Sequence, residues 1–239
     1  QGKLAAGSTG KGIAPVYADK MFRNGIRMID LLDPNVFEEK LKKGYLFSKK
    51  IIEGALLQKF DTPIQKILKD YLQYGEDLSS YICDTSVELY TAYQNGKSIL
   101  FEGAQGISLD VDHGIYPYTT SSNTATGHIS TGTGVTFRTI NRVIGVVKGY
   151  LSRVGESPLP TEINDAEAEL LRAKGGEYGT TTGRPRRIGW LDLVQIRQAV
   201  RVNGLTEIAL TKLDILNNYK KLNVCISYEI EGKTVTEMP

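Results

Sequence analysis

Three arginines and three threonines lie within eight consecutive residues of the segment G-T-T-T-G-R-P-R-R-I-G-W-L-D, residues 179–192. The planar guanidinium group of arginine can donate two parallel hydrogen bonds to a carboxylate or a phosphate. Threonine hydroxyls, and backbone N–H groups made accessible by glycine, add neutral donors. Pro185 stiffens the loop between two of the arginines, which favours a built anion-binding loop over a solvated basic turn.

Two further segments could bind parts of a nucleotide. Residues 7–12, G-S-T-G-K-G, have glycines that let backbone N–H groups approach a phosphate. Their spacing is not that of a Walker P-loop, and a plain loop is the commoner alternative. The segment T-K-L-D, residues 211–214, has a carboxylate that could accept hydrogen bonds from guanine while the lysine stem covers the base. As a four-residue pattern by itself, it favours an ordinary structural use.

Residues 101–128 are too polar for a core and too rich in potential ligand groups for a linker. Asp110, Asp112 and His113 could form a metal site, but the cluster lacks a distant third or fourth ligand. The favoured interpretation is that these side chains position residues 116–123 through hydrogen bonds. A metal-dependent hydrolase centred on the three residues stays an alternative function.

The composition is that of an ordinary globular protein of 239 residues, with 41% hydrophobic and 23% charged residues. A net charge of +2 gives no reason to expect a nucleic acid or membrane partner. No apolar run approaches the roughly 20 residues that span a bilayer. Cys83 and Cys225 lie among apolar residues, which predicts reduced thiols in the core and a cytoplasmic location.

Hydrophobic periodicity and capping residues predict the elements that hold these segments. Helices are expected within residues 34–95, opening at Asp33-Pro34, after Thr62-Pro63 and at Leu78. Strands are expected at residues 98–101, 143–148 and 207–211, the last two buried, and a hairpin at residues 222–236. We therefore expect one α/β domain over residues 1–239, with residues 34–95 as a peripheral helical insert.

These motifs closely resemble those of the adenylosuccinate synthetase family, GTP-dependent enzymes that join IMP to aspartate. The resemblance covers four stretches in the family's order, residues 7–31, 99–126, 145–162 and 177–214. It implies a large, mostly parallel central sheet flanked by helices, as in GTP-binding proteins, with peripheral helices and a C-terminal hairpin. Residues 127–137 depart from the family pattern, so no role is carried onto them.

The resemblance also implies a role for each matching residue. The IMP-binding set is Thr9, Arg23, Gln105, Thr120, Val154 and Arg184. Arg23 would reach the neighbouring active site of a homodimer. The aspartate-binding set is Thr180, Thr181, Thr182, Gly183, Arg184, Pro185 and Arg186. The GTP-binding set is Arg186, Lys212, Leu213 and Asp214.

In that family GTP phosphorylates the 6-oxygen of IMP, the amine of L-aspartate then displaces the phosphate, and Mg²⁺ balances phosphate charge. The family's amino-terminal G-D-E-G-K-G loop with its catalytic aspartate has no match here, and neither His113 nor His128 matches its catalytic histidine. The carboxy-terminal segment that completes the guanine pocket is also missing. We therefore expect an incomplete domain without a catalytic proton-transfer residue or a metal ligand. A non-catalytic nucleotide-binding module is the remaining alternative.

Overall fold

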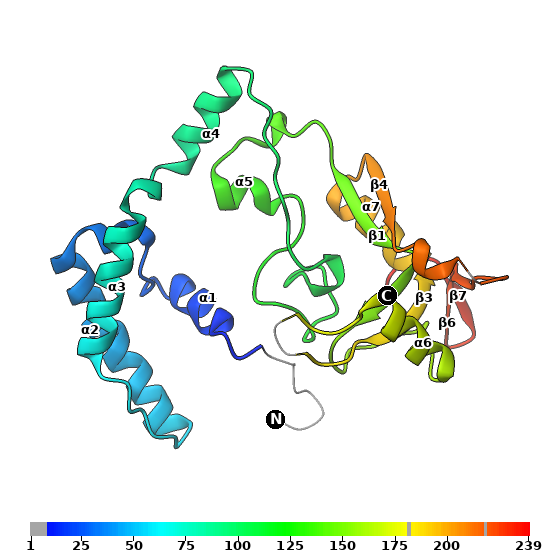
Figure 1. Cartoon of the computed structure of the whole chain (residues 1–239), viewed down its shortest axis with the longest axis horizontal. Helices are drawn as coiled ribbons and strands as arrows, with labels where there is room; N and C mark the ends of the chain where they lie inside the picture. The colour runs from blue at the N-terminus through cyan, green and yellow to red at the C-terminus, as the bar shows by residue number, and fades with distance from the viewer. Residues whose placement is uncertain (1–8, 181–182, 218) are drawn as a thin grey trace. The chain divides into compact units, whose positions relative to one another are not determined.

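The structure is a computed structural model that describes residues 9–180, 183–217 and 219–239. The chain divides into two compact units (Figure 1). The helical unit is Gly12–Lys97, and the sheet unit is Ser98–Pro239 together with residues 9–11. The expectation of a single domain with an insert over residues 34–95 stays a prediction.

The helical unit contains α1 (Ile13–Met21), α2 (Pro34–Lys50), α3 (Ile64–Leu78) and α4 (Thr85–Gln94). A 3-10 turn at Met28–Leu32, a π turn at Ile51–Ala55 and a 3-10 turn at Ser79–Tyr81 connect them. Asp33 caps α2 as predicted, because its carboxylate accepts the N–H groups of Asn35 and Val36 at 3.0 and 3.2 Å. α3 begins directly after Pro63, also as predicted.

The start predicted for the third helix is wrong. Leu78 is the last residue of α3, and α4 begins only at Thr85. The reason is the cap at Asp84, whose carboxylate accepts the N–H groups of Ser86 and Val87 at 3.0 and 3.4 Å. The predicted stop at Asn95-Gly96 is confirmed, since α4 ends at Gln94.

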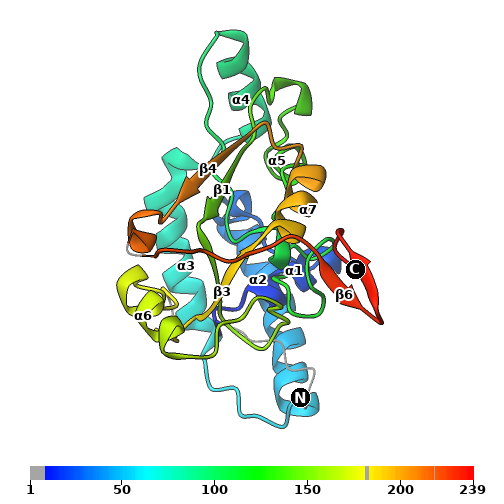
Figure 2. The same cartoon turned by 90° about the vertical axis from the view of Figure 1, so that its right-hand side faces the viewer.

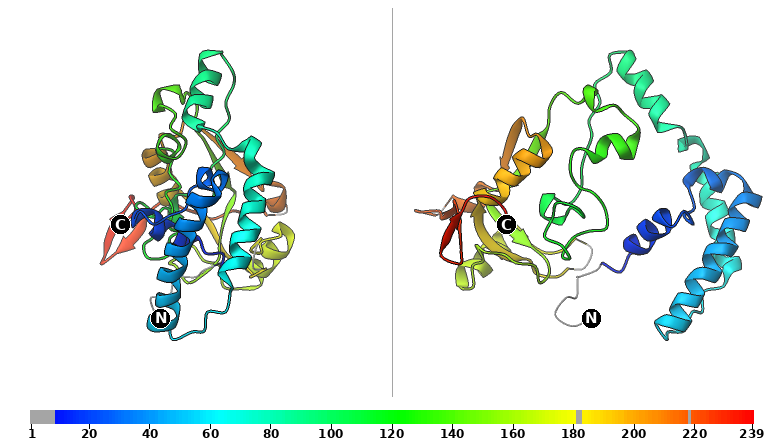
Figure 3. Two further views of the ribbon diagram at one scale, coloured as in Figure 1. Left: turned by 90° about the vertical axis from the view of Figure 1, so that its left-hand side faces the viewer. Right: turned by 180° about the vertical axis from the view of Figure 1, so that it is seen from behind.

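Helices α2 and α3 lie side by side in the helical unit (Figure 3). Their contact buries Leu31, Phe37 and Leu41 against a row on α3 with helical spacing: Ile64, Ile67, Leu68 and Leu72. Gly75 on α3 allows the close approach, because a Cβ atom there would lie 2.6 Å from the carbonyl oxygen of Leu31. This apolar row of α3 is therefore a packing surface.

The strands of the sheet unit form three small sheets. β1 (Ile144–Lys148) pairs in parallel with β4 (Glu207–Thr211), and the two strands lie side by side in Figure 2. β2 (Tyr150–Arg153) is antiparallel to β3 (Arg187–Asp192), which in turn is parallel to β5 (Val224–Cys225). β6 (Tyr228–Ile230) and β7 (Lys233–Val235) form a hairpin, which confirms the second part of the hairpin predicted at residues 222–236. The first part is wrong, because β5 pairs with β3 instead.

Three helices accompany the strands along the chain: α5 (His128–Thr133), α6 (Ala166–Gly175) and α7 (Leu193–Asn203). Short 3-10 turns occur at Ile107–Leu109, Phe137–Thr139 and Asp214–Leu216. The core gathers side chains from β2, β3, α6 and the turn after β4: Tyr150, Ile163, Ala168, Leu171, Ile188 and Leu216. Trp190 packs against this core and meets Tyr219 edge-on, with ring centroids 6.2 Å apart.

The mixed α/β class and its parallel strand pairing are confirmed, but the described residues form three small sheets instead of one large sheet. Residues 98–101 are not a strand. β1 and β4 are strands but are not buried, because a two-stranded sheet leaves side chains such as Val146 and Leu210 exposed at 75% and 47%. The expected core thiol is wrong for Cys83, which is exposed, whereas Cys225 is half-buried.

Candidate functional site

The arginine loop, residues 177–187, is a tight hairpin held by backbone hydrogen bonds. Tyr178 and Pro185 form an antiparallel bridge at its base. The N–H of Gly179 donates to the carbonyl of Arg184 at 2.8 Å, and the N–H of Gly183 donates to the carbonyl of Gly179 at 2.7 Å. Gly183 has a φ of 64°, which glycine adopts without steric penalty. These bonds define the backbone at residues 177–180 and 183–187; Thr181 and Thr182 lie outside the described residues.

The three arginines of the loop differ in what they contact. Arg187 forms a bidentate ion pair with Glu162, with Nε 2.6 Å from Oε1 and a second contact between Nη2 and Oε2. Its Nη1 also donates to the carbonyls of Gly155 and Ser157 at 2.9 and 2.7 Å. The interpretation of three arginines presented to an anion is therefore wrong for Arg187, whose donors hold the segment before α6 against β3. Arg184 is exposed and Arg186 half-buried.

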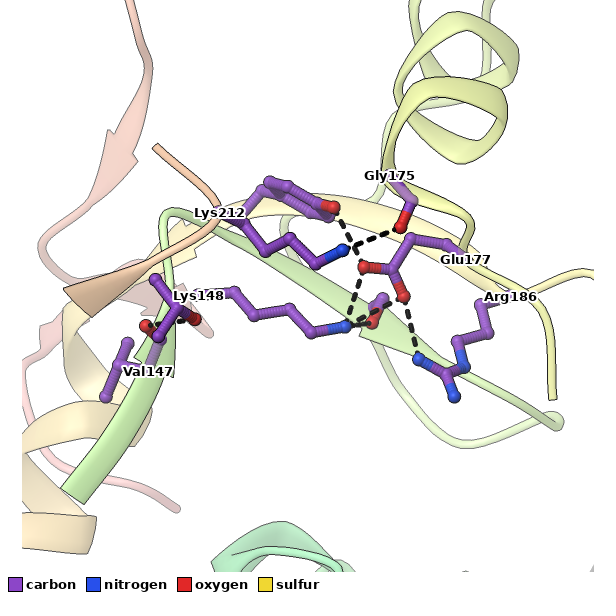
Figure 4. Close-up of polar contacts among 9 residues, drawn as sticks. Val147, Lys148, Gly175, Glu177, Arg186 and Lys212 are labelled. Atoms are coloured by element: carbon purple, nitrogen blue, oxygen red, sulfur yellow. Dashed lines mark hydrogen bonds and ion pairs between the residues drawn. The ribbon is translucent and has the colours of Figure 1, made fainter. Parts of the chain in front are cut away.

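Arg186 is tied to a buried carboxylate at the base of the loop (Figure 4). Its Nη1 donates to Oε2 of Glu177 at 2.8 Å, and Lys148 and Tyr150 donate to the same carboxylate at 2.7–2.8 Å. Burial alone would raise the pKa of Glu177, but hydrogen bonds from Lys148 and Tyr150 and the charge of Lys148 lower it to about 2. Burial together with the carboxylate raises the pKa of the Tyr150 hydroxyl. Glu177 is thus ionised at neutral pH.

The T-K-L-D segment meets the arginine loop at this same place (Figure 4). Lys212 directly follows β4, and its Nζ donates to the carbonyl of Gly175 at 2.9 Å, at the C-terminal end of α6. Leu213 and Asp214 are exposed, and Asp214 opens a 3-10 turn. The structure therefore brings Lys212 and Arg186, two of the four predicted GTP-binding residues, to either side of the turn at residues 175–177.

Residues 105–126 form a second loop, organised around the buried carboxylate of Asp110. Its Oδ1 accepts the N–H groups of Asp112 and His113, both at 2.9 Å. Its Oδ2 accepts the N–H groups of Thr124 and Ala125, the latter at 3.1 Å. Burial opposes the charge, yet these four backbone donors lower the pKa of Asp110 to about 2. We call residues 105–126 the Asp110 loop.

This use of Asp110 does not support the metal-site alternative. Both of its oxygens already accept backbone N–H groups, and Asp112 is bonded to the side-chain amide of Asn123. Across residues 9–180, 183–217 and 219–239, no group of three His, Cys, Asp or Glu side chains could hold a metal ion. The favoured interpretation, that the cluster shapes the loop through hydrogen bonds, agrees with these contacts.

Three of the predicted IMP-binding residues lie around one end of β2. Gln105 lines a cavity of about 190 Å³ whose wall also includes Ser152 and Arg153 of β2. Arg153 donates through Nη2 to the carbonyl of Tyr118 at 3.0 Å, two residues before Thr120 in the Asp110 loop. Thr120 is itself anchored through its N–H to the carbonyl of Leu109 at 2.8 Å. Val154 follows Arg153 directly and is 38% exposed.

The backbone is in the left-handed region at several of the predicted ligand residues. Five described residues other than glycine have a positive φ, and three of them are Arg23 at 62°, Gln105 at 61° and Lys212 at 61°. Such a conformation costs a non-glycine residue about 1–2 kcal/mol and is frequent at functional sites. Arg23 occupies the position after the end of α1 that glycine usually fills, with its N–H donating to Lys20.

Arg23 belongs to the helical unit, whereas Thr9, an exposed residue, belongs to the sheet unit.

The family model with the description "Adenylosuccinate synthetase" matches residues 1–239, the whole chain. The chain belongs to the adenylosuccinate synthetase family. The expected family resemblance is thereby confirmed.

Relatives from several organisms carry the family name. The chain is 50% identical over 238 residues to the adenylosuccinate synthetase of Geobacter sulfurreducens, covering 100% of this chain and 55% of the relative. It is 50% identical over 240 residues to that of Thermodesulfovibrio yellowstonii, covering 99% of this chain and 56% of the relative. The solved structure of fully ligated adenylosuccinate synthetase from Plasmodium falciparum matches with a TM-score of 0.89 and 37% identity, covering 96% of this chain and 53% of that one.

The chain therefore spans about half the length of the relatives it matches. The high TM-score shows that its fold is that of the adenylosuccinate synthetases. Within the part of the chain that the structure describes, no helix has the length and apolar character needed to cross a membrane.

Two residues at the base of the arginine loop were missed by the sequence interpretation, Lys148 and Glu177. Lys148 ends β1, and polar residues at the ends of parallel strands are a known signal for ligand sites in α/β proteins. Glu177 carries no such signal, since a single glutamate beside glycines is ordinary in a loop. Only the packing of β1, β2 and α6 around it shows what it contacts.

Proposed function

We propose that this chain is the substrate-binding part of an enzyme that ligates IMP and L-aspartate to adenylosuccinate at the expense of GTP, through a 6-phosphoryl-IMP intermediate. One observation carries the proposal in addition to family membership. Arg186 of the arginine loop and Lys212 of the T-K-L-D segment, far apart in sequence, meet at the turn of residues 175–177 (Figure 4). That juxtaposition is what a site for a phosphorylated and a carboxylated substrate requires.

The charges at this turn suit anionic substrates. Lys148 and Arg186 donate to the carboxylate of Glu177, and Lys212 donates to the nearby carbonyl of Gly175, so three cations gather around one buried carboxylate. Fixed positive charge offsets the repulsion between anionic substrates and stabilises the oxygens of a phosphoryl group in transfer. We assign Thr180–Arg186 to the aspartate carboxylates, Arg184 also to IMP, and Arg186 also to GTP, with Lys212, Leu213 and Asp214.

The Asp110 loop and the end of β2 are assigned to IMP. Gln105, Thr120 and Val154 would contact the nucleotide around the cavity beside β2, with Thr9 at its phosphate. The left-handed backbone at Gln105 supports the assignment, because such strain is retained where a side chain must point in one direction.

The remaining parts of the proposal concern the setting of the enzyme. Mg²⁺ would balance the charge of the GTP phosphates; among the described residues, no group of three His, Cys, Asp or Glu side chains could hold a metal ion. We further propose a cytoplasmic enzyme in which β1 and β4 join further strands into a large, mostly parallel sheet. The exposed apolar side chains of these two strands support a sheet whose faces are covered by further parts of the protein, because parallel sheets are buried on both faces.

The test is an assay of the whole protein that carries this chain, supplied with IMP, L-aspartate, GTP and Mg²⁺. We expect adenylosuccinate, GDP and phosphate to form in equal amounts, and omission of any one substrate to abolish all three products. Hydrolysis of GTP without adenylosuccinate, or turnover in the absence of GTP, would contradict the proposal.

The GTP assignment has its own test at Asp214. Its carboxylate would accept two hydrogen bonds from guanine, which adenine cannot donate. Asp214→Asn replaces one acceptor with a donor, which suits the 2-oxygen of xanthine. We expect GTP use to fall and XTP use to rise, each at least about tenfold in kcat/KM. A variant that retains the wild-type preference for GTP would show that Asp214 is structural.

Arg23 is proposed to complete the IMP site of the neighbouring subunit in a two-fold symmetric homodimer. Arg23→Leu should weaken IMP binding and leave GTP binding intact. Mixing this variant with a subunit that is defective in its own IMP pocket should partly restore activity, because one hybrid site is then wholly wild type. A fully active monomer at assay concentration would overturn the assignment.

A further inference from the structure

Every acceptor position of the Glu177 carboxylate is used within the protein. Oε1 accepts from Lys148 Nζ at 2.7 Å and from Tyr150 Oη at 2.8 Å. Oε2 accepts from Lys148 Nζ and from Arg186 Nη1, both at 2.8 Å. A carboxylate offers about four lone-pair positions, so this one is saturated. Glu177 therefore has no capacity to bind a ligand itself, and its role must be exerted on its partners.

The carboxylate is held in place from the side opposite to the arginine loop. Lys148 and Tyr150 belong to β1 and β2, and Lys148 Nζ also donates to Ser152 Oγ at 2.7 Å. Gly175 closes the space behind the pair: a Cβ atom there would lie 2.2 Å from Tyr150 Oη and 3.2 Å from Glu177 Cγ. The side chain of Glu177, 1% exposed, has little room to move.

Hydrogen bonds hold both the backbone and the guanidinium group of Arg186. Its backbone N–H donates to the carbonyl of Glu177 at 3.0 Å, and its own carbonyl accepts from Arg172 Nε at 2.7 Å. Its Nη1 donates to the Glu177 carboxylate, while its Nε and Nη2 have no hydrogen-bond partner among the described residues. The long side chain of Arg186 is thus held in one orientation, and its Nε and Nη2 can donate hydrogen bonds to another acceptor.

We propose that Glu177 is a positioning residue that holds the guanidinium of Arg186 toward a phosphate of GTP. The same anchor places Arg186 relative to Lys212, because Gly175, which accepts from Lys212, is two residues from Glu177. The identity of the ligand rests on the function proposed above, whereas the positioning of Arg186 stands on the contacts alone.

The alternative is that Glu177 serves only the stability of the core, and a matched control separates the two. Glu162 also pairs with an arginine of the loop, Arg187, and is half-buried. Arg187, however, donates to the protein's own carbonyls and has no proposed ligand. Glu177→Gln and Glu162→Gln are therefore compared in the whole protein for melting temperature and for the kinetics of each substrate.

We expect Glu177→Gln to raise the KM for GTP about tenfold and the KM for IMP less than about twofold. Glu162→Gln should lower the melting temperature and leave both KM values within about twofold of the wild type. Equal effects of the two variants on the KM for GTP, or none from Glu177→Gln, would overturn the proposal.

A double-mutant cycle with Arg186→Met tests whether Glu177 acts through the arginine. GTP affinity is measured by titration calorimetry of the wild type, the two single variants and the double variant. If Glu177 works by positioning Arg186, adding Glu177→Gln to Arg186→Met should change GTP affinity less than about twofold. A full additional loss in the double variant would show that Glu177 acts by another route, and the proposal would fail.

A crystal structure of Glu177→Gln provides a readout that needs no substrate. We expect the Arg186 guanidinium to leave its wild-type position or to occupy several positions, while Arg187 keeps its pair with Glu162. An unmoved Arg186 would overturn the positioning role even in an active ligase. If instead Arg186 moves but the wild-type protein neither binds GTP nor forms adenylosuccinate, the proposed function fails and the positioning role remains.

Discussion

The two predicted substrate loops are each built on a buried carboxylate, but the partners of the two carboxylates differ. Asp110 accepts four backbone N–H groups and, among the residues that the structure describes, no side chain of opposite charge. Glu177 accepts from two cationic side chains and a tyrosine hydroxyl. The first arrangement sets the path of the main chain, and the second sets the direction of charged side chains.

This difference fits what each loop would bind. A nucleotide base and ribose are recognised mainly by neutral groups of a rigid backbone, whereas phosphates and carboxylates are recognised by oriented positive charge. Changes at Asp110 should therefore act on stability first, and changes around Glu177 on charged substrates first.

The largest expected effect is at Asp110. Asp110→Asn removes the charge to which four N–H groups donate and places an amide N–H₂ among donors, which should lower the free energy of unfolding by about 3–5 kcal/mol. Urea unfolding measures the loss. The control is Asp112→Asn, whose parent side chain is exposed, and there the change should stay below about 1 kcal/mol. Equal free energies of unfolding for Asp110→Asn and Asp112→Asn would contradict the stabilising role of Asp110 and with it the contrast with Glu177.

Within the arginine loop, activity and stability should separate by residue. Arg184→Leu and Arg186→Leu should each reduce kcat/KM by the equivalent of about 2–4 kcal/mol without unfolding the protein, because each removes a charge-assisted contact to substrate. Arg187→Leu should instead reduce stability, because it breaks the pair with Glu162 and two bonds to carbonyls. Near-normal turnover by the first two variants would refute the anion-binding assignment.

A fall in pH should lower the stability that both Asp110 and Glu177 contribute to the folded protein. The folded pKa is about 2 for Asp110 and for Glu177, below the ordinary values of 3.8 and 4.5. The unfolded chain thus binds protons first as the pH falls, so each contribution is complete above about pH 5 and is lost progressively toward pH 2. Each amounts to about 2–3 kcal/mol.

Urea unfolding at a series of pH values checks this in the wild type, Asp110→Asn and Glu177→Gln. Each variant should lose one of the two contributions and hence part of the pH dependence. Unfolding free energies of the wild type that do not decline between about pH 5 and pH 3 would contradict the assignment of both lowered pKa values.

The smallest effect tests the rigidity of the Glu177 anchor. Gly175→Ala introduces a Cβ atom 2.2 Å from Tyr150 Oη, and the overpacking should lower stability by about 1–3 kcal/mol and raise the KM for GTP. Gly176→Ala is the control, because φ there is 63° but no atom of the described residues beyond its chain neighbours lies within 4 Å of the added Cβ. It should cause only backbone strain of about 1 kcal/mol, with no change in KM. Identical kinetics for both variants would show that Gly175 does not support the anchor.

Local chemistry could be predicted because it depends on neighbouring residues. The cap at Asp33, the hairpin of β6 and β7 and the bonds from the N–H groups of Asp112 and His113 to Asp110 all involve groups close in the chain. Residue types and order in four separated motifs were likewise enough to indicate the family, later confirmed over residues 1–239.

Partners that come from distant parts of the chain could not be predicted. Nothing in the segment R-P-R-R distinguishes Arg187 from Arg186. The guanidinium of Arg187 donates to Glu162 and to two backbone carbonyls, whereas that of Arg186 uses only Nη1, in its bond to Glu177, among the described residues. That difference arises because β3 begins at Arg187 and draws its side chain toward residues 155–162. The contacts of Glu177 likewise come from distant segments, because Lys148 of β1, Tyr150 of β2 and Gly175 of α6 lie around its side chain. The sequence determined which charges the arginine loop carries, and only the tertiary structure decided which of them the protein itself neutralises, since ion pairing depends on distances that folding alone sets.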